Sequence, residues 1–131
     1  MHAADSTPPP SDTPAIRVVM MPRDTNPQGT IFGGVILSLI DQAAFVEALR
    51  QSPRRYVTVA MDKIEFKAPV RVGDVVSVWA RTVRMGRTSL TIDVEVIAVR
   101  PGSCESKVTS AHVTLVAVDE QGKPTPILDQ A

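Results

Sequence analysis

The chain has 131 residues, a hydrophobic fraction of 44%, and 14 basic against 14 acidic residues, so its formal net charge is zero. This length predicts one domain with a substantial core, and the balanced charge gives no support for a nucleic-acid-binding protein, which usually carries a basic excess. A single cysteine, Cys104, excludes an intramolecular disulfide and favours a cytoplasmic protein.

The first 14 residues, MHAADSTPPPSDTP, lack the basic start and the apolar stretch of a secretory signal. Their prolines, together with Ser, Thr and Asp, predict a disordered, flexible N-terminal tail over residues 1–14. We therefore expect a single folded domain over residues 15–131. Its first strand is predicted at Ile16 to Met21, and the following RDTNPQGT segment has the composition of a turn.

A run of 19 residues, Phe32 to Arg50, predicts a long helix that ends before Ser52 and Pro53. The run, FGGVILSLIDQAAFVEALR, is apolar on nearly every side, which is typical of a buried helix. It contains too few consecutive apolar residues to span a bilayer, so we expect no membrane partner. Asp41 stands in its middle, and a carboxylate in such a helix requires a reason because burying a charge is costly.

Four long strands are predicted after the helix. The pair Asp62–Lys63 interrupts the alternation of the first of them and indicates a bulge or a change of face. The third strand alternates most cleanly. The strands are predicted at Tyr56 to Lys67, Val75 to Met85, Ser89 to Val99 and Lys107 to Val118.

One long helix followed by antiparallel strands is an α+β layout. A sheet of about five strands has one apolar face to cover and only one helix to cover it. We therefore expect a curved sheet wrapped around a central helix. The open edges of such a sheet invite pairing with a second copy, which predicts a dimer.

Ser38, Asp41 and Gln42 form a narrow polar stripe on one face of the predicted helix. The stripe is open to a plain interpretation, as a solvated face or a contact with another subunit. A chemical interpretation comes from the glycine pair Gly33 and Gly34 at the helix start. Exposed N–H donors there would form an oxyanion hole for a carbonyl, with Asp41 on its other side, and this arrangement suits acyl transfer. Asn26, in the turn before the helix, could orient a carbonyl or a water.

These residues resemble the bacterial acyl-CoA thioester hydrolases of the hotdog fold. The resemblance is carried by MMPRDTNPQGTIFGGVILSLID, by VTVAMDKIEFKAPVRVGDVV, by MGRTSLTIDVEV and by VTLVAVDEQGKP. It extends over residues 16–124, and its most specific part is the N-P-x-G-x-x-F-G-G-x6-D run. Relatives often have His before the glycine pair, where this chain has Phe32, and we interpret this difference as the mark of one branch.

The resemblance implies a catalytic carboxylate at Asp41 and an oxyanion-binding N–H at Gly33 or Gly34. It implies that Asn26 places the thioester or the water, and that the active site straddles a dimer interface. A larger assembly of dimers, tetramer or hexamer, is also implied. Asp41 would act either as general base or as nucleophile, and the sequence leaves both routes open.

Recognition of CoA requires basic residues for its phosphates. Each single Arg is open to the plain interpretation of a solvated surface charge. By resemblance the GRTS segment is the strongest candidate. The full candidate set is Arg54, Arg55, Arg84, Gly86, Arg87, Thr88 and Ser89.

No metal and no cofactor are expected, since CoA is part of substrate and product. Two other classes remain open. A hotdog protein that only binds acyl-CoA would not turn it over, and a hotdog hydratase or dehydratase would act on an enoyl-CoA. Asp41 beside the glycine pair argues against the first class. The absence of His from the predicted helix argues against the second.

Overall fold

The computed structural model describes residues 13–128, so most of the predicted tail lies outside the described residues. The predicted helix and strands all occur, with ends that differ by at most two residues. In chain order the elements are β1 (Ile16–Val19), the short 3-10 helix η2 (Pro22–Asp24), α1 (Gly33–Gln51), β2 (Arg55–Phe66), β3 (Val75–Met85), β4 (Ser89–Val99) and β5 (Glu105–Val118).

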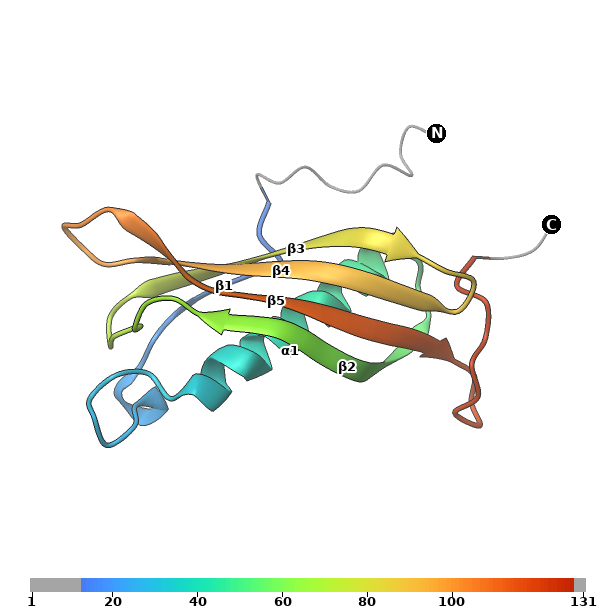
Figure 1. The fold of residues 1–131 in the computed structure, drawn as a ribbon, viewed down its shortest axis with the longest axis horizontal. Coiled ribbons are helices and arrows are strands. Elements are labelled where there is room, and N and C mark those ends of the chain that lie inside the picture. Colours follow the sequence, from blue (N-terminus) through green and yellow to red (C-terminus); the bar gives the residue numbers. More distant parts are fainter. Residues whose placement is uncertain (1–12, 129–131) are drawn as a thin grey trace.

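The five strands form one antiparallel sheet in the order β1-β3-β4-β5-β2. Helix α1 lies across one face of this sheet, as Figure 1 shows. The predicted α+β layout is therefore confirmed. No helix within residues 13–128 combines the length and the apolar character needed to cross a membrane.

The core lies between α1 and the sheet. Alternation in β4 places every second side chain against the helix, and these residues are fully buried. The helix contributes a stripe at spacings of three and four residues, which consists of Ile36, Ile40, Ala43, Ala44, Glu47 and Ala48.

The opposite side of α1 is less enclosed than its composition suggested. In the single chain the sheet covers one side of the helix only, and Phe45 and Leu49 on the other side remain exposed. Helix α1 therefore has two apolar sides. The sheet covers one, and no segment within residues 13–128 covers the other.

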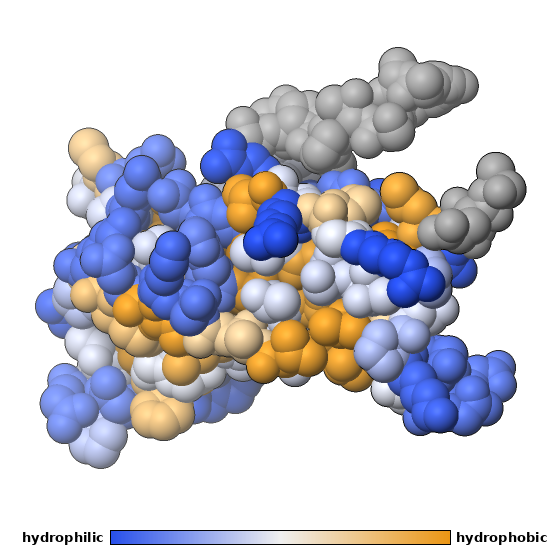
Figure 2. Space-filling model, turned by 45° about the vertical axis from the view of Figure 1, so that its right-hand side comes forward, coloured by the Kyte–Doolittle hydropathy of each residue, from blue (hydrophilic) through white to orange (hydrophobic). Residues whose placement is uncertain are grey.

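Strand β2 forms one edge of the sheet and pairs only with β5. Its register shifts between Asp62 and Glu65, and Lys63 has a φ of 52°, which confirms the predicted bulge. A second shift lies between Thr58 and Ala60. Most side chains of this strand are exposed, including large apolar ones. Figure 2 shows apolar surface gathered across the middle of the molecule, with hydrophilic surface at both ends.

Candidate active site

Asp41 lies near the middle of α1 and is partly exposed. The hydroxyl of Thr58, on β2, donates a hydrogen bond of 2.6 Å to Oδ1 of Asp41. This bond fixes the orientation of the carboxylate and leaves Oδ2 without a partner among the described residues. Thr58 was not among the residues that the sequence singled out, because only the register of β2 against the helix brings the two together.

A cavity of about 590 Å³ opens beside Asp41, between the exposed side of α1 and the start of β2. Its walls are largely apolar, and the carboxylate of Asp41 is the charged group among its lining residues. These residues are Ile16, Asp41, Gln42, Phe45, Val46, Tyr56, Val57 and Thr58. Burial raises the pKa of the Tyr56 phenol, which donates a hydrogen bond of 2.7 Å to the carbonyl of Ser52.

The predicted polar stripe lies on the exposed side of α1. Gln42 donates a hydrogen bond of 3.0 Å to the hydroxyl of Ser38, and both residues are exposed. Asp41 stands at the edge of this stripe, where the helix meets β2.

Glu47, rather than Asp41, is the fully buried carboxylate of α1, with 1% of its surface exposed. Its Oε2 accepts hydrogen bonds from the N–H and hydroxyl of Thr82, at 3.2 and 2.7 Å, and from Gln51 at 2.9 Å. Arg50 lies 3.6 Å from its other oxygen. Glu47 was not among the residues predicted to matter, although its spacing from Ile36, Ile40 and Ala44 places it on the buried stripe.

Gly33 and Gly34 are the first residues of α1, where backbone N–H groups have no partner within the helix. The side chain of Phe32 makes no capping hydrogen bond to these N–H groups. A Cβ on Gly34 would lie 2.6 Å from Cε2 of Phe32, so this exposed side chain would have to move aside for any other residue at Gly34. The helix start therefore offers donors of partial positive charge, and their role as an oxyanion hole remains a prediction.

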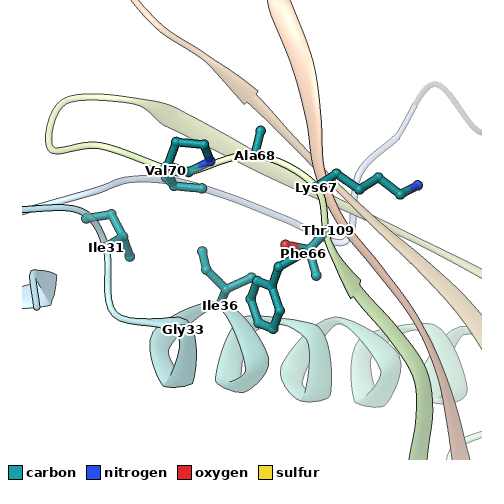
Figure 3. A pocket seen from close by; sticks show the side chains of 9 residues that line it. Ile31, Gly33, Ile36, Phe66, Lys67, Ala68, Val70 and Thr109 are labelled. Atoms are coloured by element: carbon teal, nitrogen blue, oxygen red, sulfur yellow. The ribbon is translucent and has the colours of Figure 1, made fainter. Parts of the chain in front are cut away.

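A second cavity, of about 390 Å³, opens beside Gly33. Figure 3 shows its walls, which come from the helix start, the end of β2, the following loop and β5. The lining is apolar apart from Lys67 and the hydroxyl of Thr109, and consists of Ile31, Gly33, Ile36, Phe66, Lys67, Ala68, Pro69, Val70 and Thr109.

Within one chain, Asp41 and the glycine pair do not meet around one carbonyl. They lie seven and eight residues apart on the same helix, a rise of about 10–12 Å, and they line different cavities. A reacting carbonyl must lie about 3 Å from both an oxyanion donor and the base or nucleophile. The two halves of the predicted site can therefore combine only if a second copy supplies one of them.

Asn26 uses its side chain within its own turn. Its Oδ1 accepts hydrogen bonds from the N–H groups of Gln28 and Thr30, at 2.9 and 3.1 Å, and its Nδ2 donates to Thr30 Oγ1 at 2.9 Å. These bonds order the loop that leads into α1. A direct role of Asn26 in placing a carbonyl or a water remains a prediction.

The CoA candidates gather at the end of the sheet farther from Gly33 (Figure 1). Arg54 Nε donates a hydrogen bond of 2.9 Å to the carbonyl of Ile127, whose N–H donates to the carbonyl of Arg87 at 2.9 Å. The guanidinium of Arg54 and the backbone of Arg87 therefore adjoin one C-terminal segment. Their neighbours are not uniformly basic, because Asp119 and Glu120 line a cavity with Arg54 and Arg55. The N–H of Gly86 closes the turn between β3 and β4 on the carbonyl of Ser89. Arg87 and Thr88 lie in this turn, and Arg84 lies near the end of β3.

A third carboxylate, Asp74, closes the turn between the loop after β2 and β3. Arg100 donates hydrogen bonds of 3.0 and 3.3 Å to its two oxygens, and the N–H of Arg71 donates one of 3.0 Å. Burial alone would raise the pKa of Asp74, but these bonds and the charges of Arg100 and Arg71 lower it below its usual value.

Comparison with known proteins identifies the family of this chain. The thioesterase superfamily matches residues 28–105. The acyl-CoA thioester hydrolase YciA of Salmonella typhimurium is 40% identical, over 97% of this chain and 97% of that protein. An uncharacterized acyl-CoA thioester hydrolase of Zymomonas mobilis is 46% identical, over 90% and 80% respectively.

Solved structures give the same result. A hexameric hotdog-fold thioesterase of Campylobacter jejuni is 49% identical, with a TM-score of 0.81 over 88% of this chain and 90% of that one. A hexameric broad-specificity acyl-coenzyme A thioesterase is 36% identical, with a TM-score of 0.86 over 90% and 88%. The predicted resemblance is therefore confirmed, and the chain is a hotdog-fold member of the thioesterase superfamily.

Proposed function

We propose that this protein is a cytoplasmic acyl-CoA thioester hydrolase, which cleaves a fatty or short acyl-CoA to the free acid and CoA. The observation that carries the proposal is the carboxylate of Asp41, held at 2.6 Å by Thr58 on the wall of a largely apolar cavity. Relatives that are named as acyl-CoA thioester hydrolases support the choice of substrate class.

In the proposed reaction, the thioester carbonyl accepts hydrogen bonds from the N–H groups of Gly33 and Gly34 of one copy. Asp41 of the other copy either removes a proton from a water whose oxygen attacks the carbonyl carbon, or attacks that carbon itself. The second route forms a mixed anhydride, which water then hydrolyses to the free acid and the restored carboxylate. The C–S bond breaks, and the sulfur of CoA leaves as a thiolate that takes up a proton. Because Thr58 occupies Oδ1, the free Oδ2 is the atom that we assign to proton removal or attack.

The assembly follows from the two incomplete halves of the site. We assign the contact between copies to the β2 edge and the exposed side of α1, where Phe45, Leu49, Val57 and Val59 are exposed. Burial of these side chains would stabilise a dimer, and the unpaired edge of β2 can pair with its copy. The two relatives described as hexameric support a hexamer of such dimers over a tetramer.

For the CoA moiety we propose the end of the sheet that carries Arg54, Arg55 and the GRTS turn. Guanidinium groups suit phosphate oxygens because they donate two parallel hydrogen bonds. Arg84 and Arg87 are both exposed there. The reaction as written requires no further cofactor.

The decisive experiment measures free thiol release from a panel of acyl-CoAs that differ in chain length. We expect turnover with at least one member. An enoyl-CoA in the same panel, followed by its loss of conjugation, tests for a hydratase. Binding of acyl-CoA without turnover of any panel member would identify a binding protein and refute the proposal.

The assembly has its own measurement, which is the mass in solution from light scattering. We expect a mass above that of a dimer. A stable monomer that retains full turnover would refute the shared site, because one chain cannot bring Asp41 and Gly33 to the same carbonyl.

A further inference from the structure

Thr109 has a buried hydroxyl, and the packing of the core gives no reason for a polar atom at this position. Only 1% of the residue is exposed, and its Oγ1 has no hydrogen-bond partner within residues 13–128. A buried hydroxyl without a partner typically costs about 1–3 kcal/mol. Valine has nearly the same shape and fills comparable positions at Val96 and Val113 in the same core. The threonine therefore retains a polar atom at a site where an apolar one would pack without this cost.

The hydroxyl borders the cavity beside the start of α1. Thr109 pairs with Phe66 of β2 on one side and with Val96 of β4 on the other, so the three side chains share the face that packs against the helix. A register shift next to Thr109, with Val108 as the extra residue, interrupts β5 at this point. Figure 3 shows the Thr109 oxygen on the cavity side of its strand.

The remaining walls of this cavity are apolar. Ile31, Ile36 and Val70 line it, and the ring of Phe66 extends from β2 toward the helix start, where a Cβ on Gly33 would lie 3.6 Å from it. The ammonium of Lys67 points away from the cavity (Figure 3). Apart from Lys67, Thr109 is thus the polar side chain among the residues that line the cavity.

We propose that this cavity receives the acyl group of the substrate, and that Thr109 makes the enzyme prefer acyl groups with an oxygen substituent, such as hydroxyacyl thioesters. The inference rests on the proposed thioester hydrolysis, since that reaction places the carbonyl at Gly33, directly beside the cavity. Apolar walls suit the carbon chain of the acyl group, whereas the amides of the CoA arm would require several polar partners. A hydroxyl on the chain would give Thr109 the partner that it lacks.

The test compares kcat/KM for butyryl-CoA with kcat/KM for its 3-hydroxy and 4-hydroxy derivatives. We expect Thr109→Val to lower the ratio of hydroxylated to unsubstituted substrate roughly tenfold for at least one derivative, because one hydrogen bond is lost. Thr109→Ser, which keeps the hydroxyl, should preserve most of the ratio. Thr114→Val makes the same chemical change on the outer face of the same strand and should leave the ratio unchanged.

Each outcome has a distinct meaning. An unchanged ratio in a folded Thr109→Val protein, or an equal loss for all substrates, would overturn the assignment of Thr109 while leaving thioester hydrolysis intact. Hydrolysis of none of the substrates by the unaltered protein would refute the proposed function itself. Thermal melts of each variant establish that the compared proteins are folded.

Discussion

The two halves of α1 each carry one carboxylate, and the structure treats them in opposite ways. Glu47 faces the sheet, where three hydrogen bonds converge on one of its oxygens and Arg50 lies beside the other. Asp41 faces the open side and accepts one bond, from Thr58. A carboxylate whose oxygens are occupied stabilises the fold, whereas one with a free oxygen beside a cavity is available to a substrate. Replacing each by its amide therefore tests the contrast with one chemical change.

The largest effect is expected for Asp41→Asn. The amide keeps the size of the side chain and can still accept a hydrogen bond from Thr58, but it removes the base or nucleophile. We expect kcat to fall by roughly 10²-fold or more while acyl-CoA binding and the melting temperature persist. Near wild-type turnover by a folded Asp41→Asn protein would end the proposed mechanism.

The same change at the second carboxylate, Glu47→Gln, should reverse the pattern. It weakens charge-assisted hydrogen bonds to buried groups, so we expect the free energy of unfolding to fall by about 1–3 kcal/mol. Turnover per folded molecule should change little. The check is urea unfolding at one fixed protein concentration, because assembly contributes to stability. Full stability combined with lost turnover would transfer the chemical role to Glu47.

A smaller effect is expected at Thr58, which we regard as a positioning residue. Thr58→Val removes the hydrogen bond that orients Asp41 and should lower kcat roughly tenfold with KM nearly unchanged. Thr58→Ser should restore the rate, because it retains the hydroxyl. A proportional loss of stability and rate in Thr58→Val, without rescue by serine, would assign Thr58 a structural role only.

The smallest effect is expected for Asp74, whose carboxylate oxygens are occupied by hydrogen bonds like those of Glu47. Its lowered pKa means that the bond to Arg100 stabilises the folded state above the ordinary pKa of 3.8 and that this contribution is lost as the pH falls through the lowered value. Asp74→Asn should therefore be less stable than the unaltered protein near neutral pH, and the difference should shrink below about pH 4. A difference in unfolding free energy that stays constant across this range would contradict the assignment. Turnover at neutral pH is the control and should be retained.

Periodicity predicted the fold almost completely. The strict alternation in β4 and the glycine and proline boundaries gave element ends within two residues of the observed ones, because local geometry alone sets these signals. The bulge at Asp62–Lys63 was also visible as a change of phase. The second shift near Thr58 was not predicted, since only the pairing with β5 reveals it.

The site was less accessible from the sequence. Asp41 and the glycine pair stood out by residue type, and the resemblance already implied a site shared between two copies. The structure adds that the two groups line different cavities of one chain. Thr58 and Thr109 were overlooked because a threonine in a strand is ordinary. Thr58 matters because of its hydrogen bond to Asp41, and Thr109 because its hydroxyl has no partner within the described residues. Neither feature produces a periodic pattern in the sequence. Glu47 was on the buried stripe and could have been found by extending the spacing from Ile36.

The pairing of β2 with β5 has a consequence for biosynthesis. Register pairs such as Arg55 with Val118 join the start of β2 to the last strand of the sheet. During translation β2 therefore leaves the ribosome before β5 has been synthesised. Its apolar side chains remain exposed to solvent until β5 is available. Contacts so distant in sequence slow folding and prolong exposure of aggregation-prone edges. Nascent chains released before residue 105 should consequently aggregate or bind chaperones, whereas chains that include β5 should fold.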